Sequence, residues 1–300
     1  MTDIAILGEC MLEMAPTEQD NCFQQGFAGD VYSVAVYMAR LVSPRINVRL
    51  LTAVGEGAIS LQFREALREE RIDSTHVLTH PSRHMGLYMV KNEADGERHF
   101  TYWRGESAAK DFFKIIDSYE INPPDYFFIS GISLAIYDEP SLFNLKSWLK
   151  YLKDRGTTVV FDPNYRPALW SSTGAALEVY AWAFSLCDIA LPGIEDMARL
   201  YGPETPDEVF GLLKDYDIDT IIIKNGADPI WYATPEETGQ VAVSPCHKVV
   251  DTTAAGDSFN AAFLATRLSG DSLTASIQAG SALARKVIQH RGAILPRQHQ

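Results

Sequence analysis

Residues 251–259 read Asp251-Thr252-Thr253-Ala254-Ala255-Gly256-Asp257-Ser258-Phe259, and an apolar run with helical character follows directly. A helix start presents unpaired backbone N–H groups and the positive end of the helix dipole, and both features favour an anion. Asp257 adds a carboxylate that could act as a base at the same place. The stretch therefore predicts an anion site with a base beside it, an arrangement that suits transfer of a phosphoryl group to a hydroxyl.

The alternative interpretation of this stretch is an ordinary helix start, with Asp257 in the first turn because of the helix dipole. The chain contains no G-x-x-x-x-G-K-[ST] sequence, so it is not a P-loop enzyme. Nor does Ile6-Leu7-Gly8-Glu9 belong to a G-x-G-x-x-G turn. A bound nucleotide would therefore be held by other loops.

Strand-like apolar runs alternate with helical stretches along most of the chain. We expect strands at residues 4–8, 48–54, 125–130, 157–161, 189–191 and 220–224. We expect helices at residues 31–41, 59–71, 141–155, 175–186, 207–215, 256–268 and 272–289. Such alternation implies βαβ units, and therefore an α/β fold with a largely parallel sheet.

One region departs from this alternation. Residues 86–91 and 97–104 are strand-like and are separated by Asn92-Glu93-Ala94-Asp95-Gly96, which has the composition of a turn. Residues 10–15 and 23–27 are also strand-like. We interpret these pieces as a small β lid. Alternation along its last strand puts four side chains on one face: Arg98, Phe100, Tyr102 and Arg104.

Composition narrows the classes of partner. The chain has 300 residues and a net charge of −13, which argues against nucleic acid or anionic membranes as partners. An anionic substrate would therefore need locally placed arginines. The start of the chain has no basic segment typical of a signal peptide, and the longest apolar run is too short to span a bilayer. We expect a cytoplasmic protein whose cysteines, which have no C-x-x-C spacing, are reduced, although disulfides stay open.

The stretch at residues 251–259 resembles the C-terminal signature of the ribokinase, or PfkB, family of sugar kinases. Other segments narrow the resemblance to the 2-keto-3-deoxygluconate kinases: Ile6–Met11, Gly26–Asp30, Tyr102–Arg104, Ser130–Ile136 and Asn164–Pro167. The resemblance extends from about residue 3 to Pro296. It implies a ribokinase-like, three-layer α/β/α fold with a mostly parallel central sheet. It also implies a single domain over residues 1–300, with a lid at approximately residues 9–28 and 84–106.

For catalysis, the resemblance implies that Asp257 is the base that takes the proton from the substrate hydroxyl. It assigns the anion hole to the N–H groups of Ala254, Ala255 and Gly256. A helix start is expected to lower the pKa of Asp257 and so to make it a weak base. A loose transition state builds little early charge on the attacking oxygen, so a weak but well-placed base can suffice.

Two arginines suggest an acidic substrate. Arg104 ends a lid strand, and Arg166 follows a strand end, where open α/β sheets bind ligands. Paired guanidinium groups suit a carboxylate, whereas a neutral sugar would not need them. The resemblance assigns contacts with the keto acid to Tyr88, Tyr102, Arg104 and Arg166. The residues alone leave surface ion pairs open, and Arg166 could instead reach the nucleotide phosphates.

Gly29-Asp30 precedes a predicted helix, where Asp30 could be the N-cap, could hold sugar hydroxyls as the family does, or both. The chain departs from the family pattern here. Ala28 stands where the family has a first glycine, and Ser33 where it has an asparagine. These departures keep another sugar open as the substrate.

The loop that begins with Lys224 follows a strand and contains Gly226. It is either a turn with a solvated lysine or, as in the family, a loop that lies against the nucleotide. In the second case Lys224 and Gly226 contact the nucleotide, and Gly256 at the later helix start contacts it as well. Asn164 is assigned to a phosphate or to a magnesium-bound water. The family's N-x-x-E element is replaced by Gly193 and Asp196, so the metal ligands stay unknown, while Mg²⁺ is expected to arrive with ATP.

Together these features predict ATP-dependent phosphorylation of 2-keto-3-deoxygluconate to its 6-phosphate. Two alternatives stay open: a PfkB kinase for a fructose- or ribose-like sugar, and a non-catalytic regulator that binds a sugar acid. The exposed edges of lid strands predict a homodimer, or a higher homo-oligomer, that forms through the lid.

Overall fold

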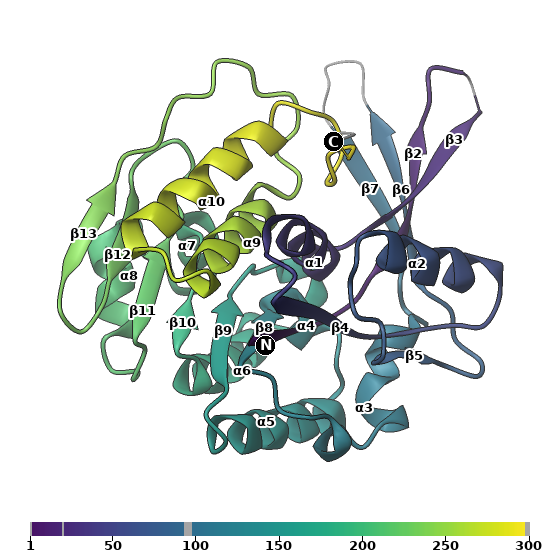
Figure 1. The fold of residues 1–300 in the computed structure, drawn as a ribbon, viewed down its shortest axis with the longest axis horizontal. Helices are drawn as coiled ribbons and strands as arrows, with labels where there is room; N and C mark the ends of the chain where they lie inside the picture. The colour runs from purple at the N-terminus through teal and green to yellow at the C-terminus, as the bar shows by residue number, and fades with distance from the viewer. Residues whose placement is uncertain (1, 20, 93–97, 298–300) are drawn as a thin grey trace.

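The computed structural model describes residues 2–19, 21–92 and 98–297. In this part of the chain a nine-stranded sheet forms the centre, in the order β13-β12-β11-β10-β9-β8-β1-β4-β5 (Figure 1). The strands from β11 to β5 pair in parallel, and β12 and β13 add an antiparallel edge. The bounds are β1 Thr2–Leu7, β4 Ile46–Val54, β5 Val77–Thr79, β8 Tyr126–Ser130, β9 Thr158–Asp162, β10 Ile189–Ala190, β11 Thr220–Ile223, β12 Ile230–Ala233 and β13 Thr238–Val241.

Helices cover both faces of this sheet because its central strands are apolar on both sides. In β1, Ile4 and Ile6 join one buried core, while Ala5 and Leu7 join the other. The first core includes α1 Asp30–Leu41, α2 Ala58–Glu69, α9 Ala255–Leu268 and α10 Leu273–Val287. The second includes α3 Phe112–Ile115, α4 Gly131–Ala135, α5 Glu139–Lys153, α6 Thr173–Leu186, α7 Ile194–Tyr201 and α8 Pro206–Leu213. The predicted three-layer α/β/α arrangement is confirmed.

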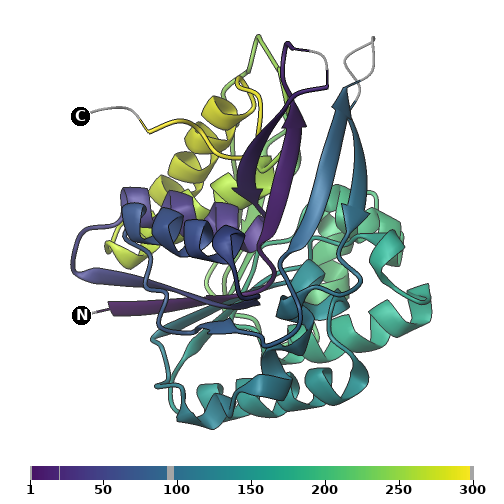
Figure 2. The same ribbon diagram turned by 90° about the vertical axis from the view of Figure 1, so that its right-hand side faces the viewer.

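A second, smaller sheet has the order β3-β2-β6-β7. Its strands are β2 Met11–Pro16, β3 Phe23–Ala28, β6 Gly86–Asn92 and β7 Arg98–Trp103. Strands β2 and β6 are parallel, and the outer pairs are antiparallel. Figure 2 shows this small sheet standing clear of the central one. The strands expected of a lid are therefore present, while most of the predicted turn at residues 92–96 lies outside the described residues.

Several elements were not predicted. They are β5, the short helices α3 and α4, the helix α7, and the edge hairpin of β12 and β13. Helix α7 ends before Gly202, which has a left-handed conformation with φ 90°.

The four cysteines are free thiols. Within the ranges that the structure describes, no helix combines the length and the apolar character that a membrane crossing requires.

Candidate active site

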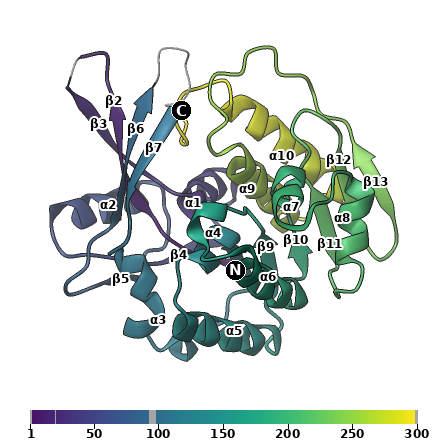
Figure 3. The same ribbon diagram turned by 180° about the vertical axis from the view of Figure 1, so that it is seen from behind.

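The carboxyl ends of the parallel strands bring polar residues to one edge of the central sheet. Ser130 and Asp162 end β8 and β9, while Glu9 follows β1 and Lys224 follows β11. Helices α1 and α9 pack side by side at the foot of the small sheet, close to this edge (Figures 1 and 3). The edge is the place where open α/β sheets bind ligands.

The start of α9 has a specific backbone geometry. Ala254 is the N-cap and adopts the left-handed conformation, with φ 61° and ψ 17°. Ala255 N–H donates to Thr252 O at 3.2 Å and so closes a turn. Among the described residues, the N–H groups of Ala254 and Gly256 have no backbone acceptor. Two of the three N–H groups expected in the anion hole are therefore unpaired, and the third already has an internal partner.

Lys224 lies beside this helix start. Its Nζ is 3.1 Å from Asp162 Oδ2 and 3.1 Å from Asn260 Oδ1, and Asn260 Nδ2 donates to Asp162 Oδ2 at 2.6 Å. A Cβ added to Gly256 would lie 3.6 Å from Lys224 Nζ. The Lys224 side chain is only 15% exposed, so the alternative of a solvated lysine is wrong. Gly226 follows in a turn with φ 58°.

Asp30 is the first residue of α1, and Gly29 is its N-cap, so the expectation that Asp30 could be the N-cap is wrong. Gly29 has a φ of 139°, and a Cβ there would lie 2.6 Å from Glu9 O, which only glycine tolerates. Ser130 Oγ donates to Asp30 Oδ2, and Asn164 Nδ2 lies 3.4 Å from the same oxygen. Asp30 thus joins α1 to the ends of β8 and β9.

Asp257 lies within electrostatic reach of two other carboxylates. Burial raises the pKa of Asp257 well above its ordinary value, and the charges of Asp30 and Asp162 raise it further. Lys224 and Arg166 lower this pKa, but by less. The expectation of a lowered pKa is therefore wrong, because burial and two carboxylates outweigh the effect of a helix start. A raised pKa makes Asp257 a stronger base than the sequence implied.

Both candidate arginines form ion pairs near one tyrosine. Arg104 Nη2 pairs with Glu9 Oε2, and its guanidinium carbon is 5.9 Å from the centre of the Tyr102 ring. Arg166 Nη1 is 3.0 Å from Asp196 Oδ1, and its side chain is 46% exposed. Burial raises the pKa of Tyr102 above its ordinary value, although the charges of Arg104 and Arg166 lower it in part. Both cations are therefore within electrostatic reach of the Tyr102 hydroxyl.

Tyr88 lies between Glu13 and Tyr102 across the small sheet, because the register pairs Glu13 with Tyr88 and Tyr88 with Tyr102. Its hydroxyl donates to Glu13 Oε2. The Tyr88 ring centre is 5.6 Å from that of Tyr102 and 5.9 Å from that of Phe100. The small sheet thus presents an aromatic face beside Arg104.

Comparison with known proteins identifies the family. Residues 1–300 match the pfkB family carbohydrate kinases. The chain belongs to this family. It is 38% identical over 304 residues to 2-dehydro-3-deoxygluconokinase of Escherichia coli K12, with 98% of this chain and 97% of the relative covered. It is 36% identical over 302 residues to the 2-dehydro-3-deoxygluconokinase of Dickeya dadantii, with 98% and 97% covered.

Solved structures of pfkB kinases share the fold. The 2-dehydro-3-deoxygluconokinase of Thermotoga maritima superposes with a TM-score of 0.82 at 18% identity, over 98% of this chain and 94% of that chain. A putative ribokinase II from E. coli, in complex with ATP and Mg²⁺, gives a TM-score of 0.83 at 21% identity, over 98% and 94%. The ribokinase-like fold expected from the sequence is therefore confirmed.

Sequence reasoning about this pfkB kinase missed four polar residues at the site: Glu9, Ser130, Asp162 and Asn260. Three of them end or follow a parallel strand, which is a signal that was available. Asn260 stands one helical turn after Asp257 and so shares its face of α9. A search of each strand end and of the face of α9 that carries Asp257 would have found them.

No group of three or more metal-ligating side chains occurs among the residues for which the structure gives positions. His76, His80 and His84 recur every fourth residue, but that spacing converges on a helix face, and residues 77–79 form a strand here. Near the site, the buried Asp162 Oδ1 has no hydrogen-bond partner within the described residues. This oxygen is the feature that best suits a hydrated cation in this pfkB kinase.

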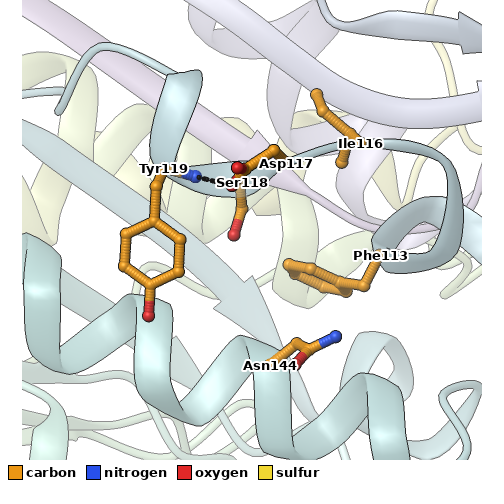
Figure 4. A pocket seen from close by; sticks show the side chains of 6 residues that line it. All are labelled: Phe113, Ile116, Asp117, Ser118, Tyr119 and Asn144. Carbon is orange, nitrogen blue, oxygen red and sulfur yellow. Dashed lines mark hydrogen bonds between the residues drawn. The ribbon is translucent and has the colours of Figure 1, made fainter.

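A pocket between the η2 turn, Ser118–Glu120, and α5 lies on the side of the molecule away from the small sheet (Figures 1 and 4). Phe113, Ile116, Tyr119 and Asn144 line it, and Asp117 Oδ1 accepts a hydrogen bond from Tyr119 N at 3.0 Å. None of the expected site residues lines this pocket.

Proposed function

We propose that this protein is a 2-dehydro-3-deoxygluconokinase, which transfers the γ-phosphoryl group of ATP to the C6 hydroxyl of 2-keto-3-deoxygluconate. The observation that carries the proposal is the juxtaposition of a raised-pKa carboxylate, Asp257, with two arginines at one edge of the sheet. The full-length similarity to 2-dehydro-3-deoxygluconokinases supports the choice of substrate. The product is 2-keto-3-deoxygluconate 6-phosphate and places the enzyme in sugar-acid catabolism.

In the proposed reaction the C6 oxygen attacks the γ-phosphorus, its proton passes to Asp257, and the bond between the γ-phosphorus and the ADP oxygen breaks. The raised pKa suits Asp257 to accept that proton. The N–H groups of Ala254 and Gly256 stabilise the charge on the transferring phosphoryl group, because they are unpaired and lie at a helix start. Ala255 N–H joins them if its turn with Thr252 opens.

The sugar acid lies between α1 and the small sheet in this proposal. Asp30 accepts hydrogen bonds from sugar hydroxyls, and Gly29 lets the sugar approach the backbone. Arg104 and Arg166 bind the carboxylate, since a guanidinium offers it two parallel donors. The rings of Tyr88 and Tyr102, which lie side by side, cover the carbon chain of the substrate.

ATP and Mg²⁺ are the proposed co-substrate and cofactor. Lys224, Asn164, Gly226 and Gly256 contact the nucleotide, and Asn164 already adopts a left-handed backbone with φ 35°. The unpaired Asp162 Oδ1 fits a Mg²⁺ ion held through water, with Asn164 as its neighbour. Bound there with ATP, the ion would neutralise charge on the phosphates.

The charges of the site support a requirement for that cation. Five carboxylates stand at the described site: Glu9, Asp30, Asp162, Asp196 and Asp257. Three cations oppose them: Arg104, Arg166 and Lys224. A sugar acid and a nucleotide add further negative charge, so we expect activity to require Mg²⁺.

The small sheet is the proposed lid of a single domain over residues 1–300, with lid segments at approximately residues 9–28 and 84–106. Its closure would exclude water, so that the sugar hydroxyl takes the phosphate. Its outer strands, β3 and β7, have open edges within the small sheet and suit a homodimer of this cytoplasmic enzyme. A monomeric mass at micromolar concentration would contradict the dimer.

A pfkB kinase for a fructose- or ribose-like sugar is the second candidate, because Ser33 Oγ is buried without a hydrogen-bond partner among the described residues. Ser33 stands where the family has the longer asparagine, so this position differs from the family pattern for the substrate. A coupled assay of ADP release with Mg-ATP, 2-keto-3-deoxygluconate, fructose and ribose separates the candidates. We expect kcat/KM for the sugar acid to exceed that for the neutral sugars by at least about a hundredfold. Preference for a neutral sugar would favour the second candidate, and binding without turnover would favour a regulator.

A further inference from the structure

A buried ion pair joins the two sheets. Glu9 follows β1 in the central sheet, and Arg104 follows β7 in the small sheet. The Glu9 side chain is 1% exposed and the Arg104 side chain 16%. The pair, formed by Glu9 Oε2 and Arg104 Nη2, spans 95 residues of sequence. It therefore ties the end of a rigid central strand to the end of a lid strand.

Two glycines hold Glu9 in place. A Cβ at Gly8 would lie 2.3 Å from Ser133 Oγ and 2.7 Å from Val31 Cγ1, so the backbone before Glu9 packs without space for a side chain. A Cβ at Gly86 would lie 2.5 Å from Glu9 Oε1 and 3.3 Å from Arg104 Cβ. Any other residue at position 86 would displace the carboxylate. Close packing at Gly8 and against Gly86 thus leaves Glu9 little freedom.

Stability alone does not account for this carboxylate. Glu9 Oε1 is buried and has no hydrogen-bond partner within the described residues. A half-satisfied buried charge costs free energy, and a buried ion pair is often no more stabilising than apolar packing. The ion pair does fix the orientation of Arg104. Glu9 contacts one nitrogen of the planar guanidinium, and the other N–H groups of that guanidinium then point in fixed directions.

We propose that Glu9 is a positioning residue that orients Arg104 toward the carboxylate of the sugar acid. This inference rests on the proposed function, in which Arg104 binds that carboxylate. The Glu9–Arg104 pair is neutral overall, so the substrate is recognised by the direction of the remaining N–H donors more than by net charge. Selection of an acidic over a neutral sugar then depends on Glu9 as well as on Arg104.

The first test compares Glu9→Ala with Glu9→Gln. We expect Glu9→Ala to raise the KM for 2-keto-3-deoxygluconate about tenfold, while the KM for ATP changes by less than about twofold. Glu9→Gln keeps an acceptor oxygen of the same shape and should restore most of the affinity. Equal increases in both KM values, or no rescue by Glu9→Gln, would overturn the inference.

The second test is a double-mutant cycle with Arg104→Ala. If Glu9 acts through Arg104, adding Glu9→Ala to Arg104→Ala should raise the sugar-acid KM by less than about twofold. An additive, roughly tenfold further increase would overturn the inference. Thermal unfolding of each variant separates loss of folding from loss of positioning. If Glu9→Ala does not fold, Glu9→Met, which fills the same space without an acceptor oxygen, takes its place in the cycle.

Glu70→Ala is the matched control. Glu70 Oε1 pairs with Arg40 Nη2 at 2.6 Å near the far end of α1, and both side chains are partly buried. This variant should lose stability and leave both KM values unchanged.

If the wild type phosphorylates only a neutral sugar, the proposed function fails, and the cycle is run with that sugar. Coupling between positions 9 and 104 then supports the positioning role, and additivity overturns it.

Discussion

Lys224 Nζ lies 3.1 Å from Asp162 Oδ2, although 62 residues separate the two in the chain. The contact joins the end of β11 to the end of β9 and skips β10 between them. Asn260 completes it from α9, with its amide nitrogen 2.6 Å from the same carboxylate oxygen. A loop proposed for the nucleotide, a central strand and the proposed catalytic helix therefore meet at one buried carboxylate.

Replacement of the lysine in this pair should destabilise the protein. Lys224→Met leaves Asp162, which is 3% exposed, with a buried charge and one amide donor. We expect the free energy of unfolding to fall by about 3 kcal/mol, measured by denaturant unfolding at neutral pH. The exposed Lys150→Met on α5 is the control and should change it by less than about 0.5 kcal/mol. Equal effects of the two variants would contradict the prediction.

Asp257→Asn should separate chemistry from binding. The amide cannot accept the proton of the substrate hydroxyl, so we expect kcat to fall about a thousandfold. Affinity for an ATP analogue, measured by calorimetry, should stay measurable because the start of α9 is unchanged. Asp271→Asn, just beyond the other end of α9, is the control and should have wild-type turnover. Near-wild-type turnover of Asp257→Asn would remove Asp257 from the mechanism.

The dependence of activity on pH should show the effect of the carboxylates near Asp257 on its pKa. Only the ionised carboxylate acts as a base, so activity is present above the raised pKa and is lost as the pH falls through it. This acid limb should lie above the ordinary aspartate value of about 3.9. Asp30→Asn removes one negative neighbour, so the limb of its residual kcat/KM should move to lower pH. A limb that stays in place or moves upward would show that Asp30 does not set this pKa.

Gly131→Ala should disturb the site through the backbone. Its Cβ would lie 1.9 Å from Pro163 O and 2.0 Å from Tyr180 Oη, so the segment that carries Asn164 must shift. We expect a loss of about 3 kcal/mol in the free energy of unfolding and a higher KM for ATP. Gly211→Ala in α8 meets no atom within 4 Å and should gain roughly 0.5–1 kcal/mol. A harmless Gly131→Ala would contradict the packing at this turn.

The elements that the sequence predicted best are those with a strong local signal. Strands β1, β8 and β9 each contain a run of at least three apolar residues, because both faces of the central sheet are buried there. The edge hairpin was missed because Trp231 and Tyr232 are only partly buried and pair in the antiparallel direction. Helix α7 gives a weaker local signal than the equally short α8, because its N-cap, Gly193, has no side-chain cap, whereas Thr205 and Glu208 form a capping box at the start of α8.

The residues of the candidate site also divide into those with a local sequence signal and those without one. Asp257, Gly29 and Asp30 stand in short motifs whose geometry is local, at the starts of α9 and α1. Glu9 lies in the segment Ile6–Met11, but neither that segment nor the residues around Asp162 show what these carboxylates pair with, because their partners lie far away along the chain. No spacing rule could pair them, because the pairing depends on the order of strands in the sheet.

The sequence by itself determined the helix start at residues 251–259 and the alternation of strands and helices, and it supplied the two arginines from which we propose an acidic ligand. Those properties follow from backbone periodicity and from residues close together in the chain. Only the tertiary structure decided that Glu9 pairs with Arg104, that Lys224 is held by Asp162, and that the pKa of Asp257 is raised. Burial and Coulomb energies depend on distance through space, and folding brings together charges that the sequence separates.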